Sequence, residues 1–357
     1  MSAQTSADVA SANPGTTPDD ADDLLLSVEN LQVHFFTDEG VARAVDGVTL
    51  SVRRGSFLAI VGESGCGKTV TAYSILRLIQ EPGRIVGGRI ELFPKDSTRI
   101  DVTELTEDSE ELYSIRGGTA SMVFQEPMTA LSPVHTIGNQ ICEAILLHQE
   151  VSEEEARRQA IDMLSKVGIP GPETRIDLYP HELSGGMRQR AVIAMALACN
   201  PSLLIADEPT TALDVTVQAQ ILELMKSLQR QFGMAIMFIT HDLGTIAGMA
   251  DKVAVMYLGR IVEYAPVKRI FSNPLHPYTV GLLNSVPKLG SGSRERLESI
   301  EGTVPLPMGM PPQCGFLSRC ERAIAGQCDG RVPPLIEVEE DHLVRCVLYE
   351  EDRKASV

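Results

Sequence analysis

The sequence has no apolar run long enough to cross a bilayer as a helix. A spanning helix needs about 20 predominantly apolar residues, and the longest uncharged apolar stretch, residues 191–199, is about half that length. This stretch is typical of a buried helix. We therefore expect a protein with no spanning segment of its own, which lies in the cytoplasm and could dock on a membrane protein.

The sequence also has fewer basic residues than acidic ones. The 357 residues include 31 Lys and Arg against 48 Asp and Glu, which gives a formal net charge of -17. A broad electrostatic footprint on nucleic acid needs clustered Lys and Arg, so this composition disfavours nucleic acid as a partner. The first 23 residues contain no Lys or Arg and no apolar core. They lack the features of a secretory signal and are predicted to form a disordered tail.

Hydrophobic residues make up 43% of the chain, which is ample for a buried core. Strand-like alternation at residues 31–36 and 42–52 is divided by turn residues at 38–40. Ser152 and Glu155 form a capping box before a helix, and Asp214 is placed to cap another. Further strands are predicted at residues 57–61, 203–206, 235–239 and 253–257, and a helix at 69–79. This alternation predicts an α/β fold with a parallel sheet and a helical insert at about residues 126–190.

A glycine-rich loop follows the apolar run 57–61 directly and matches the P-loop pattern in full. Its glycines let backbone N–H groups surround phosphates, and the helix that follows adds its positive end. Lys68 is placed to reach the β and γ oxygens, and Thr69 to offer its hydroxyl to Mg²⁺. A strand before the loop and a helix after it favour a site for Mg·ATP over a chance turn. The predicted ATP contacts are Gly62, Ser64, Gly65, Cys66, Gly67, Lys68, Thr69 and Val70.

Two carboxylates stand directly after the apolar run 203–206. Asp207 is placed to hold Mg²⁺ through water, and Glu208 to polarise the attacking water as a general base. Two acids after a strand can also cap a helix, but a P-loop upstream favours the catalytic interpretation. His241 and Gln125 follow other apolar runs, and ligands of open α/β sheets bind beyond such strand ends. Position alone leaves a structural role open for both.

The segment Leu183-Ser184-Gly185-Gly186-Met187-Arg188-Gln189-Arg190 resembles the signature motif of ATP-binding-cassette (ABC) ATPases. The P-loop, Gln125, Asp207-Glu208, Ala212-Leu213-Asp214 and His241 accompany it in the order usual for that family. The resemblance covers roughly residues 25–350. It implies an ABC nucleotide-binding domain with a P-loop core, an antiparallel β subdomain and a helical signature subdomain.

The resemblance also implies how such domains work. Two of them pair head to tail, and ATP lies between one P-loop and the signature segment of the partner. The signature contacts to the partner's ATP would come from Ser184, Gly185, Gly186 and Gln189. Gln125 would sense Mg²⁺, His241 would contact the γ-phosphate, and Asp214 would act across the dimer. Phe35 matches the aromatic residue that stacks on adenine, with Phe36 as a rival and a core role as the alternative.

Within that family, the sequence most resembles the oligopeptide/dipeptide permease ATPases. Nickel importers share much of the same pattern. The resemblance rests on residues 179–182, residues 276–279 with Leu282-Leu283, and the late cysteines. Where that branch often has Asp after the glutamine, this chain has Glu126. The resemblance implies residues 24–275 as the ATPase domain and 276–357 as a small Cys-rich extension. It also implies a second ATPase subunit in a heterodimer, two membrane-spanning permease subunits, an extracytoplasmic substrate-binding protein, and a peripheral location on the cytoplasmic face of the membrane.

The motifs themselves are satisfied by a homodimer as well as a heterodimer. A soluble cassette ATPase that acts on DNA or ribosomes is the main alternative function. Such proteins usually carry two cassettes or long coiled coils, whereas this chain has one cassette and no sustained heptads. A regulatory module that binds ATP without turnover is disfavoured, because Glu208 and His241 are both present.

Four cysteines crowd the end of the chain: Cys314, Cys320, Cys328 and Cys346. In a reducing cytosol such a group is more often a metal site than a disulfide framework. None of the intervals is the Cys-x-x-Cys of common zinc sites, so spacing alone leaves metal binding open. Some members of the resembled family carry an iron–sulfur cluster on matching cysteines. We therefore expect a [4Fe–4S] cluster, with Zn²⁺ as the alternative.

Overall fold

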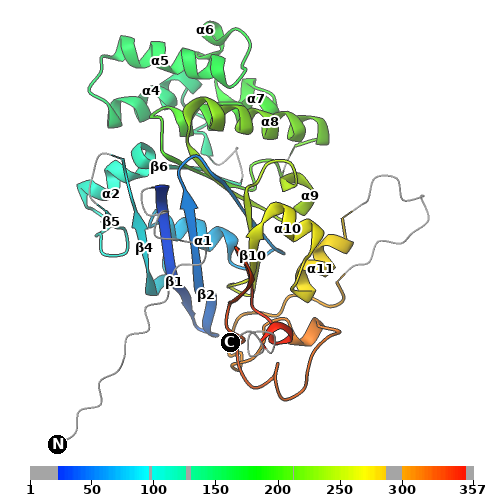
Figure 1. Cartoon of the computed structure of the whole chain (residues 1–357). Helices are drawn as coiled ribbons and strands as arrows, with labels where there is room; N and C mark the ends of the chain where they lie inside the picture. The colour runs from blue at the N-terminus through cyan, green and yellow to red at the C-terminus, as the bar shows by residue number, and fades with distance from the viewer. Residues whose placement is uncertain (1–22, 96–98, 126–129, 212, 287–299, 351–357) are drawn as a thin grey trace, which may run out of the picture.

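The computed structural model describes residues 23–95, 99–125, 130–211, 213–286 and 300–350. Two sheets form its centre, a bundle of helices lies at one end, and the C-terminal residues lie at the other (Figure 1). The predicted N-terminal tail lies outside the described residues except for Asp23, as do Glu126 and Ala212. Within the described part, no helix combines the length and apolar character needed to cross a bilayer.

The smaller sheet is antiparallel, with strand order β2-β1-β4-β5. The predicted strands at 31–36 and 42–52 are confirmed as parts of β1 (Leu24–Thr37) and β2 (Gly40–Arg53), which pair across the predicted turn. The other two strands are β4 (Gly83–Leu92) and β5 (Ile100–Asp101). Alternate residues are buried at 48–52 of β2 and at 31–33 of β1, so one face of the sheet packs on the core there, whereas residues 25–28 of β1 are all buried.

The larger sheet has the order β11-β12-β10-β9-β3-β8-β7-β6. The pairs β6–β7, β7–β8, β8–β3 and β3–β9 are parallel, which confirms the predicted parallel sheet. These five strands are β3 (Phe57–Val61), β6 (Ala120–Val123), β7 (Leu203–Asp207), β8 (Ala235–Thr240) and β9 (Lys252–Tyr257). Phe57, Ala59 and Val61 join one hydrophobic core, while Leu58 and Ile60 join the core under the antiparallel sheet. Burial on both faces explains why β3 is continuously apolar.

The helices α4 to α7 gather at one end of the molecule (Figure 1). Ser152 caps α5 by accepting from the Glu155 N–H at 3.2 Å, and Asp214 caps α8 by accepting from the Val217 N–H at 3.0 Å. The Asp214 cap is as predicted, and so is the Ser152 half of the predicted capping box, while the Glu155 carboxylate accepts from Gln159 Nε2 at 3.3 Å. The bounds are α4 (Ile137–His148), α5 (Glu153–Lys166), α6 (Pro172–Arg175), η3 (Pro180–Glu182), α7 (Gly185–Leu197) and α8 (Val215–Phe232).

The helix after the P-loop is shorter than its apolar spacing predicts. Spacing predicts residues 69–79, but α1 (Lys68–Ile75) ends earlier. Arg77 adopts a left-handed backbone with φ 53°, which ends the helix, and its guanidinium donates to the Leu105 carbonyl at 3.2 Å. The short segments between β5 and β6 are α2 (Glu110–Ser114) and η2 (Ile115–Thr119), and those after β8 are α9 (Leu243–Ile246), α10 (Val267–Ser272) and α11 (Pro277–Asn284).

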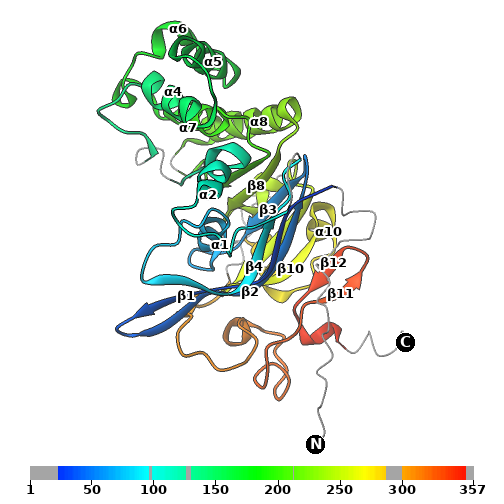
Figure 2. The same cartoon turned by 90° about the vertical axis from the view of Figure 1, so that its left-hand side faces the viewer.

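The C-terminal residues extend the larger sheet. β12 (His342–Val344) pairs with β10 (Arg260–Pro266), and β11 (Ile336–Glu339) pairs with β12 at the edge. Figure 2 shows these strands at the end opposite the helices α4 to α7. The short turns η4 (Leu317–Arg319) and η5 (Val347–Tyr349) flank them. A segment with little core of its own is therefore held by the edge of the main sheet.

A buried polar cluster joins this region to β10. The Glu263 carboxylate, 0% exposed, accepts from the N–H groups of Leu275 and His276 and lies 2.8 Å from His342 Nε2. His276 caps α11 by accepting from the Tyr278 N–H at 3.1 Å. Burial lowers the pKa of His276 to about 4.

This lowered pKa predicts a loss of stability in mild acid. Below the usual His pKa of about 6.5 the unfolded chain binds a proton that the folded His276 refuses, so stability falls as the pH decreases. Between pH 7 and pH 5 we expect this residue to remove about 2 kcal/mol from the free energy of unfolding. Urea unfolding of the wild type and of His276→Asn, which keeps a capping side chain, measures the effect. Equal pH slopes for the two proteins would contradict it.

Candidate nucleotide site

The loop between β3 and α1 has the backbone that a P-loop needs. Gly62 has φ 156° and Gly67 has φ 102°. A Cβ at Gly62 would lie 2.3 Å from the Met256 carbonyl oxygen, and one at Gly67 would lie 2.3 Å from that of Ala44. No side chain fits at either position, so both glycines are required by close backbone packing as well as by conformation.

Lys68 begins α1 and its side chain is 5% exposed. Its Nζ donates to the Gly62 carbonyl at 2.8 Å and to the Glu63 carbonyl at 3.1 Å. It also lies 3.9 Å from Glu208 Oε1. The ammonium is thus held by the loop carbonyls at a position that lines the cavity described below.

Asp207 ends β7 and is 0% exposed. Burial raises the pKa of its carboxyl, while Thr69 and Lys68 act to lower that pKa. Thr69 approaches this carboxylate, but neither Oδ atom makes a hydrogen bond of normal geometry to a described residue. A buried carboxylate without partners is costly, and a cation beside Thr69 would satisfy it.

Glu208 is the meeting point of the predicted catalytic residues. Its Oε2 accepts from Gln125 Nε2 at 3.3 Å and from Thr211 Oγ1 at 2.9 Å, and it lies 3.2 Å from His241 Nδ1. The Glu208 backbone is left-handed, with φ 44°, an uncommon conformation for a non-glycine residue. The ends of β6, β7 and β8 therefore bring Gln125, Glu208 and His241 together, as expected where parallel strands end at one edge.

A cavity of about 420 Å³ lies between these strand ends and the P-loop. Ala44 of β2, which sequence reasoning missed, also lines it. No local motif marks this residue, since only the folding of β2 over the loop brings it there. The other lining residues are Ser64, Gly65, Gly67, Lys68, Thr69, Val70, Gln125, Glu208 and His241.

Phe35 and Cys66 do not line this cavity. The Phe35 ring is half-buried and lies against Gly83, at the margin of the core under the antiparallel sheet, whereas the neighbouring Phe36 is 47% exposed. Cys66 is fully buried, and burial raises the pKa of its thiol. Cys66 therefore supports the loop from within, and the adenine contact remains a prediction.

The predicted signature residues lie away from the P-loop of the same chain. Ser184 is exposed and caps α7 by accepting from the Met187 N–H at 3.4 Å, with Gly185 and Gly186 in the first turn. Gln189 is only 1% exposed. Asp214 is exposed at the start of α8. None of these residues lines the 420 Å³ cavity, so one chain holds only part of the predicted site.

The late cysteines lie in one region, where the Cys314 N–H donates to the Cys328 carbonyl at 2.8 Å. Burial raises the pKa of Cys314 and Cys320, and that of Cys346 to about 11, and neighbouring thiols contribute to each rise. Among the described residues, however, there is no group of at least three His, Cys, Asp or Glu side chains that could hold a metal ion. The arrangement supports neither the predicted [4Fe–4S] cluster nor the Zn²⁺ alternative.

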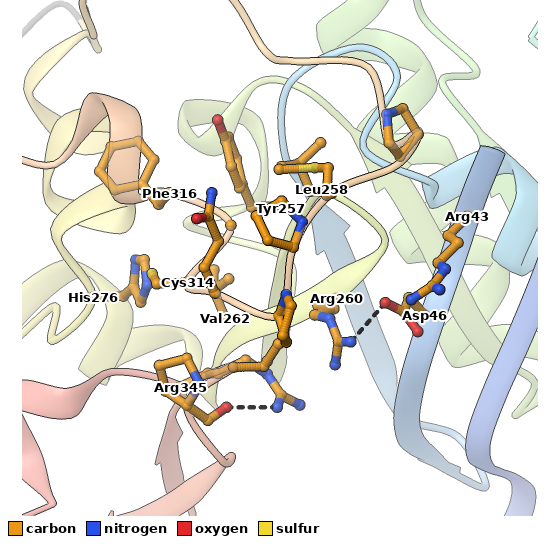
Figure 3. A pocket seen from close by; sticks show the side chains of 18 residues that line it. Arg43, Asp46, Tyr257, Leu258, Arg260, Val262, His276, Cys314, Phe316 and Arg345 are labelled. Atoms are coloured by element: carbon orange, nitrogen blue, oxygen red, sulfur yellow. Dashed lines mark hydrogen bonds and ion pairs between the residues drawn. The ribbon is translucent and has the colours of Figure 1, made fainter. Parts of the chain in front are cut away.

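Cys314 also lines a second cavity, of about 360 Å³, between β2 and the C-terminal residues. In Figure 3, Arg43 and Asp46 lie across this cavity from Cys314 and Phe316. Arg260 pairs with Asp46 at 2.6 Å, and Arg345 donates to the Pro333 carbonyl at 2.9 Å. The C-terminal residues therefore close over the cassette around an open space.

Two family models match the chain. Residues 45–211 match the model described as ABC transporter, and residues 262–328 match that of the oligopeptide/dipeptide transporter C-terminal region. Among solved structures, the dimeric ATP-binding cassette MJ0796 in a post-hydrolysis state bound to ADP and Pi has a TM-score of 0.60. It is 27% identical, and the match covers 68% of this chain and 99% of that chain.

Relatives extend the similarity over almost the whole chain. The "Probable peptide ABC transporter ATP-binding protein y4tR" of Sinorhizobium fredii is 51% identical over 91% of this chain and 95% of its own length. The oligopeptide transport ATP-binding protein AppD of Bacillus subtilis is 49% identical, over 92% and 98%. The dipeptide transport ATP-binding protein DppD of the same organism is 48% identical, over 93% and 97%. The chain belongs to the ABC transporter ATPases that carry the oligopeptide/dipeptide transporter C-terminal region.

Proposed function

We propose that this chain is the ATP-hydrolysing subunit of an ABC importer for dipeptides or oligopeptides. The meeting of Gln125, Glu208 and His241 beside the P-loop carries the hydrolytic part of the proposal. The peptide substrate is supported by the names of the relatives AppD and DppD and by the matched C-terminal region. In such a complex the chain turns over ATP, and other subunits contact the peptide.

The proposed reaction is attack of water on the γ-phosphate of ATP. Glu208 takes a proton from the attacking water while the water oxygen bonds to the γ-phosphorus. The bond between the γ-phosphorus and the bridging oxygen breaks, and ADP leaves. Hydrogen bonds from Thr211 and Gln125 hold the Glu208 carboxylate in place. His241 is 58% exposed beside it and is placed to contact the γ-phosphate.

Thr69 and Asp207 are the proposed residues for Mg²⁺, with Gln125 completing the set. The unpartnered, buried Asp207 oxygens support this assignment. When bound, Mg²⁺ supplies positive charge that offsets the phosphate oxygens. The loop N–H groups and Lys68 orient the phosphates, and the apolar strands behind them exclude water from the bottom of the site.

The site is proposed to be completed by the signature segment of a second cassette. Ser184 stands exposed at the N-terminus of α7, where the helix dipole and free N–H groups favour an anion. The similar dimeric cassette supports a paired arrangement. A heterodimer joined to two permease subunits and served by an extracytoplasmic binding protein is the proposed assembly, with this chain peripheral on the cytoplasmic face of the membrane.

Transport assays with the whole complex test the substrate class. In proteoliposomes that contain the two cassettes and the permease subunits, with the binding protein outside, a labelled tripeptide is expected to accumulate when MgATP is enclosed. Radioactive nickel supplied to the same vesicles is the control. Nickel uptake without peptide uptake would assign the chain to the nickel branch of the family. Turnover of ATP with no uptake of either would favour a cassette ATPase outside transport.

A further inference from the structure

Glu63, the second residue of the P-loop, is bound by the C-terminal region. Its carboxylate forms a two-pronged ion pair with Arg319: Nη1 lies 2.7 Å from Oε2, and Nη2 lies 3.0 Å from Oε1. The two residues are 256 positions apart in sequence. The fork of a guanidinium fixes a carboxylate in direction as well as distance.

Arg319 is itself held rigidly. Its side chain is only 4% exposed, and its guanidinium lies over the ring of Tyr257, 5.8 Å from the centroid, and over that of Phe316, at 5.9 Å. Its Nε donates to the Glu301 carbonyl at 2.9 Å. A buried, stacked guanidinium with fixed partners differs from a surface ion pair, whose contribution is usually small.

Tyr278 binds the backbone of the same loop residue. The Glu63 N–H donates to the Tyr278 hydroxyl at 2.8 Å. The Tyr278 ring, 0% exposed, packs against Tyr257 at 4.7 Å and Phe316 at 5.4 Å between centroids. Arg319 and Tyr278 thus hold the side chain and the N–H of Glu63 from one aromatic cluster.

The third group of Glu63, its carbonyl, accepts from Lys68 Nζ at 3.1 Å. The position of Glu63 therefore affects where the phosphate-binding ammonium lies. The Glu63 side chain does not line the 420 Å³ cavity, but the next residue, Ser64, does, so the Glu63 charge acts on a nearby phosphate site unless Arg319 offsets it. Two effects on nucleotide affinity follow, one geometric and one electrostatic.

We infer that Arg319 and Tyr278 are positioning residues through which the C-terminal region sets the nucleotide affinity of the P-loop. Both lie within residues 262–328, the matched oligopeptide/dipeptide C-terminal region. The inference rests on the proposed use of the P-loop as the nucleotide site. It gives this C-terminal region a direct task in ATP binding.

Calorimetric titration of the full-length chain with MgADP, which is not hydrolysed, tests the inference. Arg319→Gln is expected to raise Kd about tenfold, because it leaves an unpaired carboxylate near the phosphates. In Glu63→Gln/Arg319→Gln that charge is gone, and Kd is expected to return to within about threefold of the wild type. Tyr278→Phe, which keeps the buried ring, is expected to raise Kd about threefold through the lost hydrogen bond.

Arg331→Gln is the matched control, since Arg331 is half-exposed and pairs with Glu350 beyond the matched residues 262–328. Its Kd is expected to equal that of the wild type. The inference is overturned if Arg319→Gln and Tyr278→Phe both bind like the wild type. If the double variant binds as weakly as Arg319→Gln, the loss comes from the lost ion pair that positions Glu63, and the electrostatic effect is refuted. Lys68→Ala distinguishes failure of this inference from failure of the proposed nucleotide site. Undiminished MgADP binding by that variant would refute the nucleotide site itself.

Discussion

Replacing Glu208 by Gln is expected to lower the rate of ATP hydrolysis about a thousandfold, in line with the loss of a general base. Gln has nearly the same size and can still accept from Thr211, so the carboxamide should occupy the same place. It cannot take the proton of the attacking water. The unusual backbone at Glu208, with φ 44°, indicates that the surrounding fold holds this residue in one position.

The measurement is steady-state phosphate release by the assembled complex, together with MgATP binding to the isolated chain. Binding is expected to persist while turnover is lost, which separates chemistry from affinity. Glu339→Gln is a suitable control, because Glu339 pairs with Arg269 on the surface at 3.0 Å. If Glu208→Gln turned over ATP like the wild type, another group would have to be the base.

The second large effect is expected at the signature segment. Ser184→Arg should lower turnover by the assembled complex at least about a hundredfold, because a bulky side chain would occupy the helix N-terminus proposed to face the partner's ATP. In the isolated chain the same variant should bind MgADP with unchanged Kd, since Ser184 does not line the chain's own cavity. The two readouts together test whether the site is shared between subunits.

Ser152→Arg provides the matched control for the second prediction. Ser152 is also an exposed helix N-cap in the same helical region, so its replacement should cost similar stability, about 1 kcal/mol. Its turnover is expected to stay near that of the wild type. Equal losses in both variants would mean that the effect arises from helix stability. If the isolated Ser184→Arg chain bound MgADP more weakly than the wild type, the signature segment would act on the chain's own nucleotide site and not on that of the partner.

The sequence predicted those features that depend on local spacing. The P-loop is contiguous, so its glycines, Lys68 and Thr69 could be assigned from the residue pattern alone. Glu208 and His241 are 33 positions apart, yet both follow apolar strands. The ends of parallel strands meet at one edge, which is why their proximity could be expected. The same reasoning from local pattern explains the caps at Ser152 and Asp214.

Contacts made by tertiary packing could not be predicted in this way. Ala44 enters the cavity because β2 lies over the loop, and Arg319 reaches Glu63 only after the C-terminal region has folded back. Arg77 ends α1 through a backbone conformation that its residue type does not favour. The cysteines are a different case: their crowding in sequence indicated a metal site, but among the described residues no group of three or more ligating side chains is arranged to hold a metal ion.

Coupled transport tests most directly the proposal that this chain drives peptide uptake by hydrolysing ATP. Peptide uptake and phosphate release would be measured in the same proteoliposomes, with wild-type chain and with Glu208→Gln. We expect uptake to require enclosed MgATP, and we expect the variant to lose uptake and hydrolysis together. Continued peptide uptake by vesicles whose Glu208→Gln chain no longer hydrolyses ATP would contradict this proposal.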